Sequence, residues 1–551
     1  MPFMKKTRIS QSLVLPASLL LISFIVYLVT LAPGITWAHE GADGGDLITA
    51  AYTLGIPHPP GYPFYVLLGR LFSLVPLRNV AYRLNLMSAT CAALAVVVFH
   101  LWARATLQRA SAGTATRWVT GTAASASLLL AFSRLFWSQA LIAEVYALNA
   151  LMVALILYLL WRWDGMSASQ RAVIPNEVKN LAHWKGDSSS QKTLLRTTGG
   201  GAAVLALLAF VYGLSLGNHL TMLLLLPLLL YYLSSSPHFR QTGWRGILLA
   251  GICFLAGLAV YLYLPLRAAA RPFLNWGDPL TFDRFCWMVS GALYRHYVFA
   301  LPPGYLPMRL AKWAGDFVWQ FGPWGVALGL MGAWTLAGEA RRQFICTASI
   351  LTLYSAYAIG YNTADSYVYL IPAYLIWAFW ISRGMFYLLD SLGVLQEPRS
   401  RRAMPIVGLM FLLPLISLVW NFAALDLSRD HEASDYAEAV LGSLPAHALV
   451  ISAADEHTFT LWYAQQVEKK RPDLLILDRD LLPYDWYRRN VLPRYPGVIV
   501  PVDGADAYEW LTCFLDENIA RWPILLTDAD ERLMARYHAE QRGPVYQLTG
   551  R

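Results

Sequence analysis

Charged residues are scarce in this 551-residue chain: Asp, Glu, Lys and Arg together make up 14% of it, against about 25% in an average soluble protein. Apolar residues make up 57%. This composition excludes an intrinsically disordered chain and argues against an ordinary cytosolic enzyme or a nucleic-acid-binding protein. The net charge of +8 does not favour nucleic acid either, because membrane proteins collect Lys and Arg in cytoplasmic loops for topological reasons.

Cysteine is also scarce. Cys91, Cys253, Cys286, Cys346 and Cys513 form no CxxC motif and no His/Cys cluster with the spacing of a metal site. A disulfide framework is therefore not expected. Only Cys286 and Cys513 fall in segments that we expect outside the membrane, so one optional bridge is conceivable.

Long apolar runs dominate the first 425 residues, and about eleven of them approach the roughly 20 residues needed to cross a bilayer. They are Leu13–Thr30, Asn85–Ala103, Val119–Phe136, Ile142–Trp161, Gly201–Leu216, His219–Leu233, Ile247–Leu266, Val318–Leu336, Phe344–Tyr361, Tyr367–Leu388 and Pro405–Phe422. No small-residue cleavage site follows the first run, so we interpret it as a retained helix and not as a signal peptide. Residues 1–425 are thus predicted to form a polytopic α-helical membrane domain.

The basic residues predict the orientation of this domain. With a cytoplasmic N-terminus, every connection predicted to be cytoplasmic is basic, as the positive-inside rule requires. These connections contain Arg104, Arg109 and Arg117, the Arg162–Arg196 loop, Arg240 and Arg245, Arg341 and Arg342, and Arg399, Arg401 and Arg402. Eleven crossings of the inner or plasma membrane would leave the C-terminus on the extracytoplasmic side, together with a first outer loop at 34–83 and a large outer loop at 267–313.

From Asp426 onward the composition changes, and residues 426–551 are predicted to form an extracytoplasmic soluble α/β domain with mostly parallel strands. Strands are expected at Leu449–Ser452, Leu474–Leu477, Val498–Val502 and Ile524–Thr527, and helices at Ala433–Leu441, Phe459–Lys469, Asp485–Leu492, Ala507–Ile519 and Glu531–Gln541. The domain has no Gly-rich phosphate loop and no nucleophile elbow, which favours an accessory role such as holding an acceptor. The segment from Ala453 to His457 follows a strand, where ligand sites of α/β folds are favoured.

The most informative polar segment is the first outer loop. Asp43 and Asp46 lie three residues apart among glycines and are followed by the run His58-Pro59-Pro60-Gly61-Tyr62-Pro63. The prolines and the glycine predict a rigid, non-helical turn, and a carboxylate at the water interface suits a general base. The alternative is that Asp43 or Asp46 only caps a helix.

The strings Gly41-Ala42-Asp43-Gly44-Gly45-Asp46 and Leu54-Gly55-Ile56-Pro57-His58-Pro59-Pro60-Gly61-Tyr62-Pro63 resemble the signature loop of the transmembrane protein O-mannosyltransferase-like family. That family was long catalogued as a domain of unknown function and is similar to the GT-C membrane glycosyltransferases. Its usual loop reads Asp-Ser-Gly-Glu, so both acids are kept here. Further pieces follow in the family's order at 81–86, 136–149, 213–219, 262–267 and 275–279, and the resemblance covers most of residues 30–300.

The resemblance implies a GT-C-like fold and the transfer of a sugar from a polyprenyl-phosphate donor to a hydroxyl acceptor on the outer face. Protein Ser or Thr, a glycan and a lipid stay open as acceptors. Asp43 would act as general base in a single inverting displacement, and Asp46 and Glu144 are the other catalytic candidates. The alternative function is a polytopic transporter or a lipid-linked sugar flippase, since intramembrane carboxylates are common in transporters.

The candidate substrate-binding residues lie near predicted outer helix ends. They are Arg267, Arg271, His219, Asn218, His58 and Asn149. Guanidinium groups bind phosphate, so Arg267 and Arg271 are predicted to hold the donor phosphate, with interfacial anchoring as the alternative.

Two further features leave alternatives open. Glu144 lies one turn inside a predicted membrane helix, where a carboxylate is either functional or paired, here with Arg134. The polar junction from Tyr361 to Tyr367 is a candidate for lining the sugar site.

His39 and Glu40 precede the acidic pair, but their spacing matches no metal motif, so no cofactor is predicted and a divalent metal is not favoured.

The topology gives the first testable prediction. A reporter that is active only in the cytoplasm should be silent when it is fused after Arg551, because eleven crossings from a cytoplasmic N-terminus end outside. The same reporter inserted in the basic connection that contains Arg109 and Arg117 should be active, because this connection is predicted to be cytoplasmic, and it serves as the control. An active C-terminal fusion would mean that the helix count is wrong by an odd number.

Overall fold

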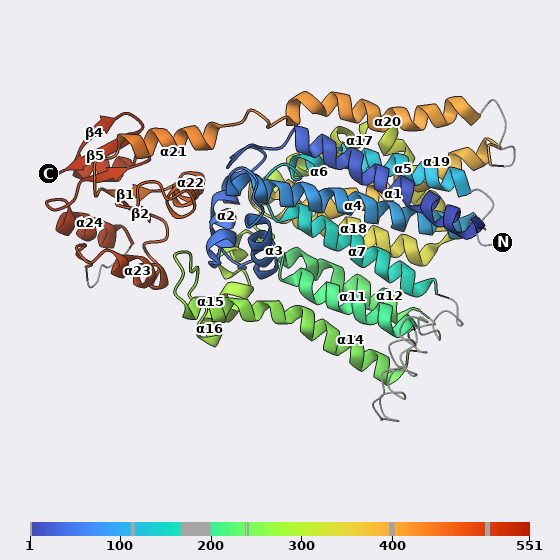
Figure 1. Ribbon diagram of the computed structural model, residues 1–551, viewed down its shortest axis with the longest axis horizontal. Coiled ribbons are helices and arrows are strands. Elements are labelled where there is room, and N and C mark those ends of the chain that lie inside the picture. Colours follow the sequence, from blue (N-terminus) through green and yellow to red (C-terminus); the bar gives the residue numbers. More distant parts are fainter. Residues whose placement is uncertain are drawn as a thin grey trace.

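The computed structural model shows a long helical bundle with a smaller α/β domain at one end (Figure 1). It describes residues 3–111, 116–166, 200–236, 239, 242–395, 403–501 and 507–550. Most of the predicted Arg162–Arg196 loop, together with Arg240, Arg399, Arg401 and Arg402, lies outside the described residues. The N- and C-termini lie at opposite ends of the molecule (Figure 1).

The bundle is a polytopic helical array, as predicted. Its helices are α1 (Phe3–Val29), α4 (Val80–Ala110), α5 (Thr116–Ala131), α6 (Arg134–Ser138), α7 (Tyr146–Asp164), α11 (Gly200–Leu216), α12 (Leu226–Ser234), α14 (Gly243–Leu258), α15 (Tyr263–Ala269), α17 (Leu306–Glu339), α18 (Arg341–Gly360), α19 (Ile371–Ser391) and α20 (Ala403–Leu425). Each predicted apolar run falls mainly on these helices. Six helical segments of the described chain are long and apolar enough to cross a membrane, and three apolar helices are shorter, so the number of eleven crossings stays a prediction.

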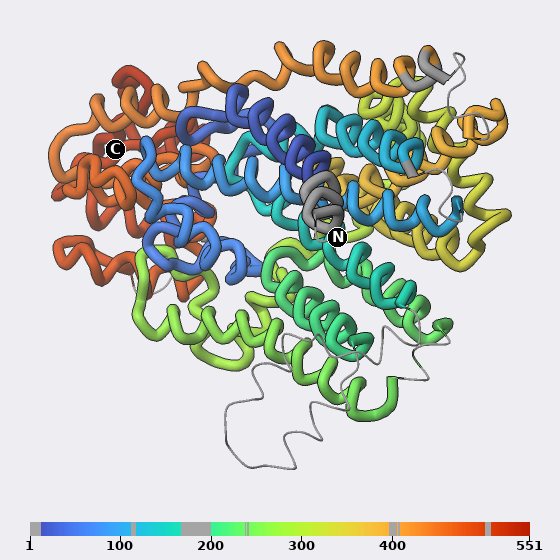
Figure 2. The backbone as a smooth tube through the Cα atoms, turned by 45° about the vertical axis from the view of Figure 1, so that its right-hand side comes forward, coloured from blue at the N-terminus to red at the C-terminus, as the bar shows by residue number. Residues whose placement is uncertain are grey.

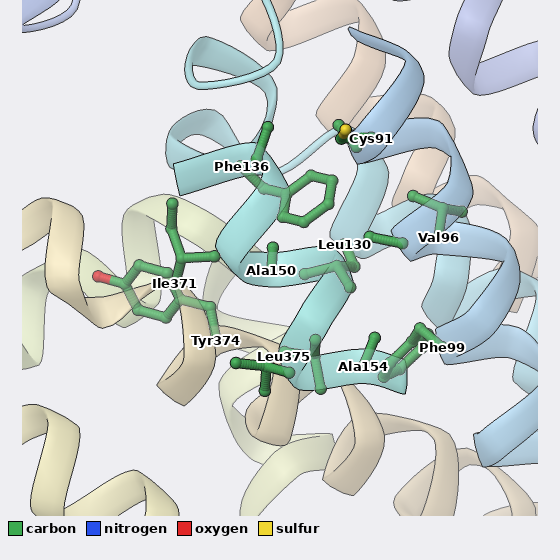
Figure 3. Close-up of a cluster of buried hydrophobic side chains, with 14 of the residues drawn as sticks. Cys91, Val96, Phe99, Leu130, Phe136, Ala150, Ala154, Ile371, Tyr374 and Leu375 are labelled. Carbon is green, nitrogen blue, oxygen red and sulfur yellow. The ribbon is translucent and has the colours of Figure 1, made fainter. Parts of the chain in front are cut away.

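The core of the bundle forms where α4, α7 and α19 meet (Figure 3). Ala150 and Ala154 on α7 are small, and they lie against Phe99 of α4 and Leu375 of α19 in this view. Small residues allow helix backbones to approach closely, which is how membrane helices pack without a hydrophobic driving force between them. The segment from Ser366 to Ser391, which contains α19, is buried along almost its whole length, so it forms the centre of the bundle.

The outer helices expose large apolar side chains. Trp244 and Leu255 on α14, Trp324 on α17, and Val419 and Trp420 on α20 are all more than half exposed, at 69%, 62%, 72%, 71% and 73%. An apolar surface of this extent is typical of a helix face that contacts lipid. The same surface would aggregate on a soluble protein.

Short elements connect the bundle to the α/β domain. The first loop contains the 3₁₀ helix η1 (Gly41–Asp43), α2 (Gly44–Thr53) and α3 (Pro63–Ser73), and the large loop contains α16 (Phe282–Val289) and η4 (Ala292–Tyr297). An isolated parallel bridge pairs Ile56 with Asn275, and the Ile56 amide donates to the Leu274 carbonyl at 2.8 Å. Segments more than 200 residues apart in the sequence are thus held together at the outer end of the bundle.

The α/β domain has a five-stranded sheet with the order β2-β1-β3-β5-β4. Its elements are α21 (Glu432–Ser443), β1 (Leu449–Ser452), α22 (Asp455–Gln466), β2 (Leu475–Asp478), α23 (Asp485–Val491), α24 (Ala507–Asn518), β3 (Ile524–Leu526), α25 (Glu531–Arg536), β4 (His538–Arg542) and β5 (Val545–Thr549). Strand β1 is parallel to both β2 and β3, whereas β5 pairs antiparallel with β3 and β4.

Two predictions for this domain are wrong. The described residues 498–501 form no strand, although Val502 lies outside the described residues. The helix expected at Glu531–Gln541 ends at Arg536, and the following residues form β4. Strand β4 is almost wholly exposed at the sheet edge, so it has no alternation of apolar and polar residues, and its charged residues are equally typical of an exposed helix. The conceivable bridge between Cys286 and Cys513 is not formed either, because both thiols are free.

The α/β domain packs directly on the first loop, as Figures 1 and 2 both show. The Trp37 indole donates to the Glu456 carbonyl at 3.1 Å and to the Thr460 hydroxyl at 2.9 Å. A Cβ atom at Gly45 would collide with the backbone of Phe459. Ala50, Ile56 and Val66 of the first loop belong to the same buried apolar cluster as the core of the α/β domain, so the domain is seated on the loop that contains the two acids.

Candidate functional site

Asp43 is a carboxylate that does not cap its helix. It occupies the N-cap position of α2, but its side chain makes no capping hydrogen bond, so the alternative that it only caps this helix does not describe it. Solvent reaches 44% of the side chain. Burial of the carboxyl group raises the pKa of Asp43, His58 lowers it, and Asp46 and Asp365 raise it, so that its pKa lies above the ordinary 3.8.

Asp46 is fully buried, and both of its carboxylate oxygens are engaged in internal hydrogen bonds. Its Oδ2 accepts from the His58 backbone amide at 2.9 Å and lies 2.8 Å from His58 Nδ1, while its Oδ1 accepts from the Trp276 indole at 3.2 Å. Both oxygens are therefore occupied, and neither caps α2. The geometry favours a role in holding His58 over direct contact with a substrate.

His58 links the two acids. Its Nδ1 faces Asp46, and its Nε2 lies 3.5 Å from Asp43 Oδ2 and 3.2 Å from the Tyr62 hydroxyl. Burial lowers the pKa of His58, but Asp43, Asp46 and Glu144 together raise it to about 9. An imidazolium thus lies between two carboxylates, and we name this arrangement the Asp46–His58–Asp43 chain. The sequence predicted His58 as a substrate-binding candidate, and the structure places it inside the acid pair.

Glu144 is buried directly before α7. Its Oε2 accepts from the Val145 amide at 3.3 Å, and its Oε1 has no hydrogen-bond partner among the described residues. The predicted alternative partner, Arg134, lies over the Trp319 ring with 6.0 Å to its centroid. Glu144 contributes to the raised pKa of His58, so its charge acts on the Asp46–His58–Asp43 chain.

Aromatic rings surround these acids. His219 stacks on Tyr62 with centroids 6.2 Å apart, and it also contacts Tyr146 at 5.6 Å and Tyr369 at 5.7 Å. Tyr294 lies edge-on to His58 at 6.1 Å. Tyrosine presents a flat apolar face and a polar hydroxyl, so this wall offers both packing and hydrogen bonding to a ligand.

The predicted amides lie beside this wall. Asn218 donates to the Val145 carbonyl at 3.1 Å, and its Oδ1 has no partner in the described chain. The Oδ1 of Asn149 is likewise buried without a partner in those ranges. Asp365, from the polar junction at 361–367, interacts with Asp43. Binding by these residues stays a prediction.

Arg267 and Arg271, the arginines predicted to bind the donor phosphate, make contacts within the protein. Arg267 Nε donates to the Leu54 carbonyl at 2.6 Å, which ties α15 to the end of α2. Arg271 is exposed, and its carbonyl accepts from Arg494 of the α/β domain at 2.8 Å. The structure thus gives Arg267 a structural contact, and the donor-binding role that the sequence predicts for it competes with that of Arg134 in the experiment described below.

A basic cavity of about 350 Å³ lies beside the first loop. Arg134 and Lys312 line it, together with His39, Asp316 and Tyr367, and Lys312 pairs with Asp316 at 3.3 Å. The Tyr367 hydroxyl donates to Glu40 at 3.1 Å, so the cavity adjoins the start of the acidic loop. Sequence reasoning did not bring Arg134 and Lys312 together in one cavity, because only the packing of α6 against α17 does so.

An apolar cavity of about 590 Å³ shares Trp319 and Gln320 with the basic one. It lies between α5, α17 and α20, where Gly322 leaves the helical conformation ahead of Pro323 and kinks α17. Leu413, Ile416 and Trp420 are among its walls. The two cavities are therefore neighbours on either side of Trp319 and Gln320, one mainly polar and one mainly apolar. In the ranges that the structure describes, no group of three or more His, Cys, Asp or Glu is arranged to hold a metal ion.

Comparisons with known proteins agree with the loop signature. Residues 43–242 match the protein O-mannosyl-transferase TMEM260 N-terminal domain, and residues 433–498 match the TMEM260-associated domain 2. The resemblance to the transmembrane protein O-mannosyltransferase-like family is confirmed. The first match begins at Asp43, the proposed base.

Two curated relatives carry this similarity further. The chain is 24% identical to protein O-mannosyl-transferase tmem260 of Dictyostelium discoideum, over 95% of this chain and 65% of the relative. It is 26% identical to protein O-mannosyl-transferase TMEM260 of Mus musculus, over 84% of this chain and 63% of the relative. The chain therefore spans somewhat less than two thirds of the length of these relatives.

The fold is that of the GT-C membrane glycosyltransferases. The structure resembles ArnT from Cupriavidus metallidurans bound to undecaprenyl phosphate, with a TM-score of 0.54, 12% identity and 98% of both chains covered. At this identity the likeness establishes the fold. The prediction of a GT-C-like helical membrane protein with a C-terminal α/β domain is confirmed.

The Asp46–His58–Asp43 chain predicts a pH-dependent stability. His58 has an ordinary pKa of 6.5 and a pKa of about 9 in the folded protein. Its contribution is therefore complete below pH 6.5 and is lost as pH rises through about 9, by on the order of a few kcal/mol. Thermal unfolding in detergent should show a wild-type midpoint that falls over this pH range, and His58→Gln should remove that fall.

The exposed His431 provides the matched control. His431→Gln should keep the wild-type pH profile, because the side chain lies at the surface. If His58→Gln unfolds with the same pH dependence as wild type, the imidazolium does not lie between charged acids.

Proposed function

We propose that this chain is a membrane glycosyltransferase that moves a sugar from a lipid-phosphate donor to a hydroxyl acceptor at the outer end of the bundle. The single observation that carries the proposal is Asp43: a solvent-accessible carboxylate, not used as a helix cap, with a raised pKa and a cationic partner held by Asp46. The relatives named protein O-mannosyl-transferases support mannose as the sugar and a protein hydroxyl as the acceptor.

Asp43 has the properties of a general base. A pKa raised toward the working pH strengthens a carboxylate as a proton acceptor, while the neighbouring imidazolium keeps it ionised before the reaction. In the proposed step the acceptor oxygen attacks the anomeric carbon and its proton passes to Asp43. The bond from that carbon to the phosphate oxygen breaks, the phosphate leaves with the electron pair, and the configuration inverts.

The two neighbouring cavities support a lipid-phosphate donor. Arg134 supplies positive charge for a phosphate, with Lys312 beside it in an ion pair with Asp316, and the apolar cavity suits a hydrocarbon chain entering from the bilayer. The fold neighbour ArnT was solved with undecaprenyl phosphate, a ligand of the same amphipathic type. Because the basic cavity adjoins the acidic loop through Tyr367 and Glu40, a headgroup bound there would extend toward Asp43.

The base is tested by Asp43→Asn. The amide keeps the shape of the side chain but cannot take a proton, so sugar transfer should fall at least about 10²-fold while donor binding persists. Transfer of radiolabelled sugar from the lipid donor by purified protein measures this. Asp283→Asn, an equally isosteric change of an exposed acid on α16, should leave transfer intact. Wild-type turnover in Asp43→Asn would overturn the role of Asp43 as the base, whereas no transfer by the wild-type protein would leave the flippase alternative standing.

The donor cavity is tested by Arg134→Ala. Loss of one charged partner of a partly desolvated phosphate should weaken donor affinity by on the order of 2–4 kcal/mol, and Arg134→Lys should recover part of it because the fork geometry is lost but the charge is kept. The donor KM measures this. Arg267→Ala should lower thermal stability and leave the donor KM unchanged; if the two variants behave the other way round, the phosphate binds at Arg267.

A further inference from the structure

Asp455 opens α22 at the carboxyl end of β1, which is flanked by parallel neighbours on both sides. Loops at this edge of a parallel sheet commonly form ligand sites. Here this edge of the sheet lies next to the first loop, because α22, which follows β1, packs on η1 and α2. The binding edge of the α/β domain is therefore presented to the loop of the proposed base.

The docking contacts orient Asp455. Phe459, one helical turn further along α22, contacts Gly45 so closely that no side chain fits there. Residues four apart share one face of a helix, so Asp455 and Phe459 are on the side that meets the first loop. Gly45 lies between Asp43 and Asp46 in the sequence, which places Asp455 beside the Asp46–His58–Asp43 chain.

The pKa of Asp455 also responds to the residues of the Asp46–His58–Asp43 chain. Burial, Asp43, Asp46 and Asp480 raise the pKa of Asp455 to about 6, and His58 opposes them. The side chain is nevertheless exposed to solvent, and within the described chain no group donates a hydrogen bond to it. Two solvent-accessible carboxylates from different domains, Asp43 and Asp455, thus share one electrostatic environment.

We propose that Asp455 is a positioning residue for the acceptor, so that the α/β domain supplies the acceptor side of the active site. This inference rests on the proposed glycosyltransferase function. A carboxylate with no internal partner is available to accept a hydrogen bond from an N–H group of an acceptor peptide or to pair with a basic side chain. Asp480 pairs with Arg479 at 3.1 Å, so Asp455 and Asp43 are the acids left to attract a cation, and a peptide with a basic residue beside its hydroxyl residue should be preferred over one with an acidic residue.

The test is Asp455→Asn in the full chain, assayed with polyprenyl-phosphate mannose and two synthetic peptides. Both peptides carry one Thr in an Ala/Gly background, flanked by Lys in one and by Glu in the other. The acceptor KM for the Lys peptide should rise by roughly tenfold, the scale of one charged hydrogen bond, and the preference for Lys over Glu should shrink toward equality. The donor KM and the slow release of sugar to water should not change.

The neighbouring Glu456 gives the matched control, because it is also exposed at the start of α22, and only its backbone carbonyl takes part in the docking contact, where it accepts from the Trp37 indole. Glu456→Gln should behave as wild type, and Asp455→Glu should recover part of the acceptor affinity. In wild type the acceptor KM should fall as pH rises through about 6, where Asp455 ionises among Asp43, Asp46, Asp480 and His58. Asp455→Asn should lose this dependence.

The outcomes separate the inference from the function on which it rests. Unchanged acceptor KM in Asp455→Asn, or an equal change in donor and acceptor parameters, overturns the positioning role while transfer by wild type upholds the glycosyltransferase. Release of sugar by wild type with neither peptide glycosylated overturns the peptide acceptor. A wild-type protein that neither releases nor transfers sugar overturns the proposed function itself.

Discussion

The buried carboxylate of Asp46 is the group on which the arrangement of the outer end depends. A buried charge is tolerated only when it is paired and fully hydrogen-bonded, and Asp46 meets this condition with two donors from His58 and one from Trp276. His58 comes from the first loop and Trp276 from the large loop. Trp276 also contacts Phe459 and Trp486 of the α/β domain. One carboxylate therefore fixes two loops, and through Trp276 it fixes the domain that covers them.

The sequence predicted those parts of the site that are encoded locally. Apolar runs predicted the bundle, and the spacing of Asp43, Asp46 and His58 within one short loop marked the acidic site. It could not separate the roles of the two acids, because burial decides them: Asp46 is 0% exposed and Asp43 44%. Nor could it pair Arg134 with Lys312, since that proximity arises from helix packing. The edge strand β4 was missed for the opposite reason, because it packs against so little that no pattern marks it.

Departures from the usual family loop become intelligible from these contacts. Asp43-Gly44-Gly45-Asp46 has Gly where the family commonly has Ser, and a Cβ at Gly44 would make only an ordinary contact, 3.7 Å from the Ala143 carbonyl. Gly44 is therefore tolerated and not required. Gly45 is required, because the backbone of Phe459 occupies the space of its side chain. Asp in place of Glu at position 46 still reaches both His58 and Trp276.

The close contact between Gly45 and the Phe459 backbone holds α22 on the first loop. Any movement of α22 away from the first loop would remove Phe459 from Gly45 and Trp37 from Thr460 together, exposing apolar surface that is now buried in one shared cluster. Such surface costs about 25 cal/mol per Å² to expose, so the docked arrangement is the favoured resting state. In the proposed reaction the acceptor would be held against α22, and the docked arrangement would keep that acceptor side of the site beside Asp43 before either substrate binds.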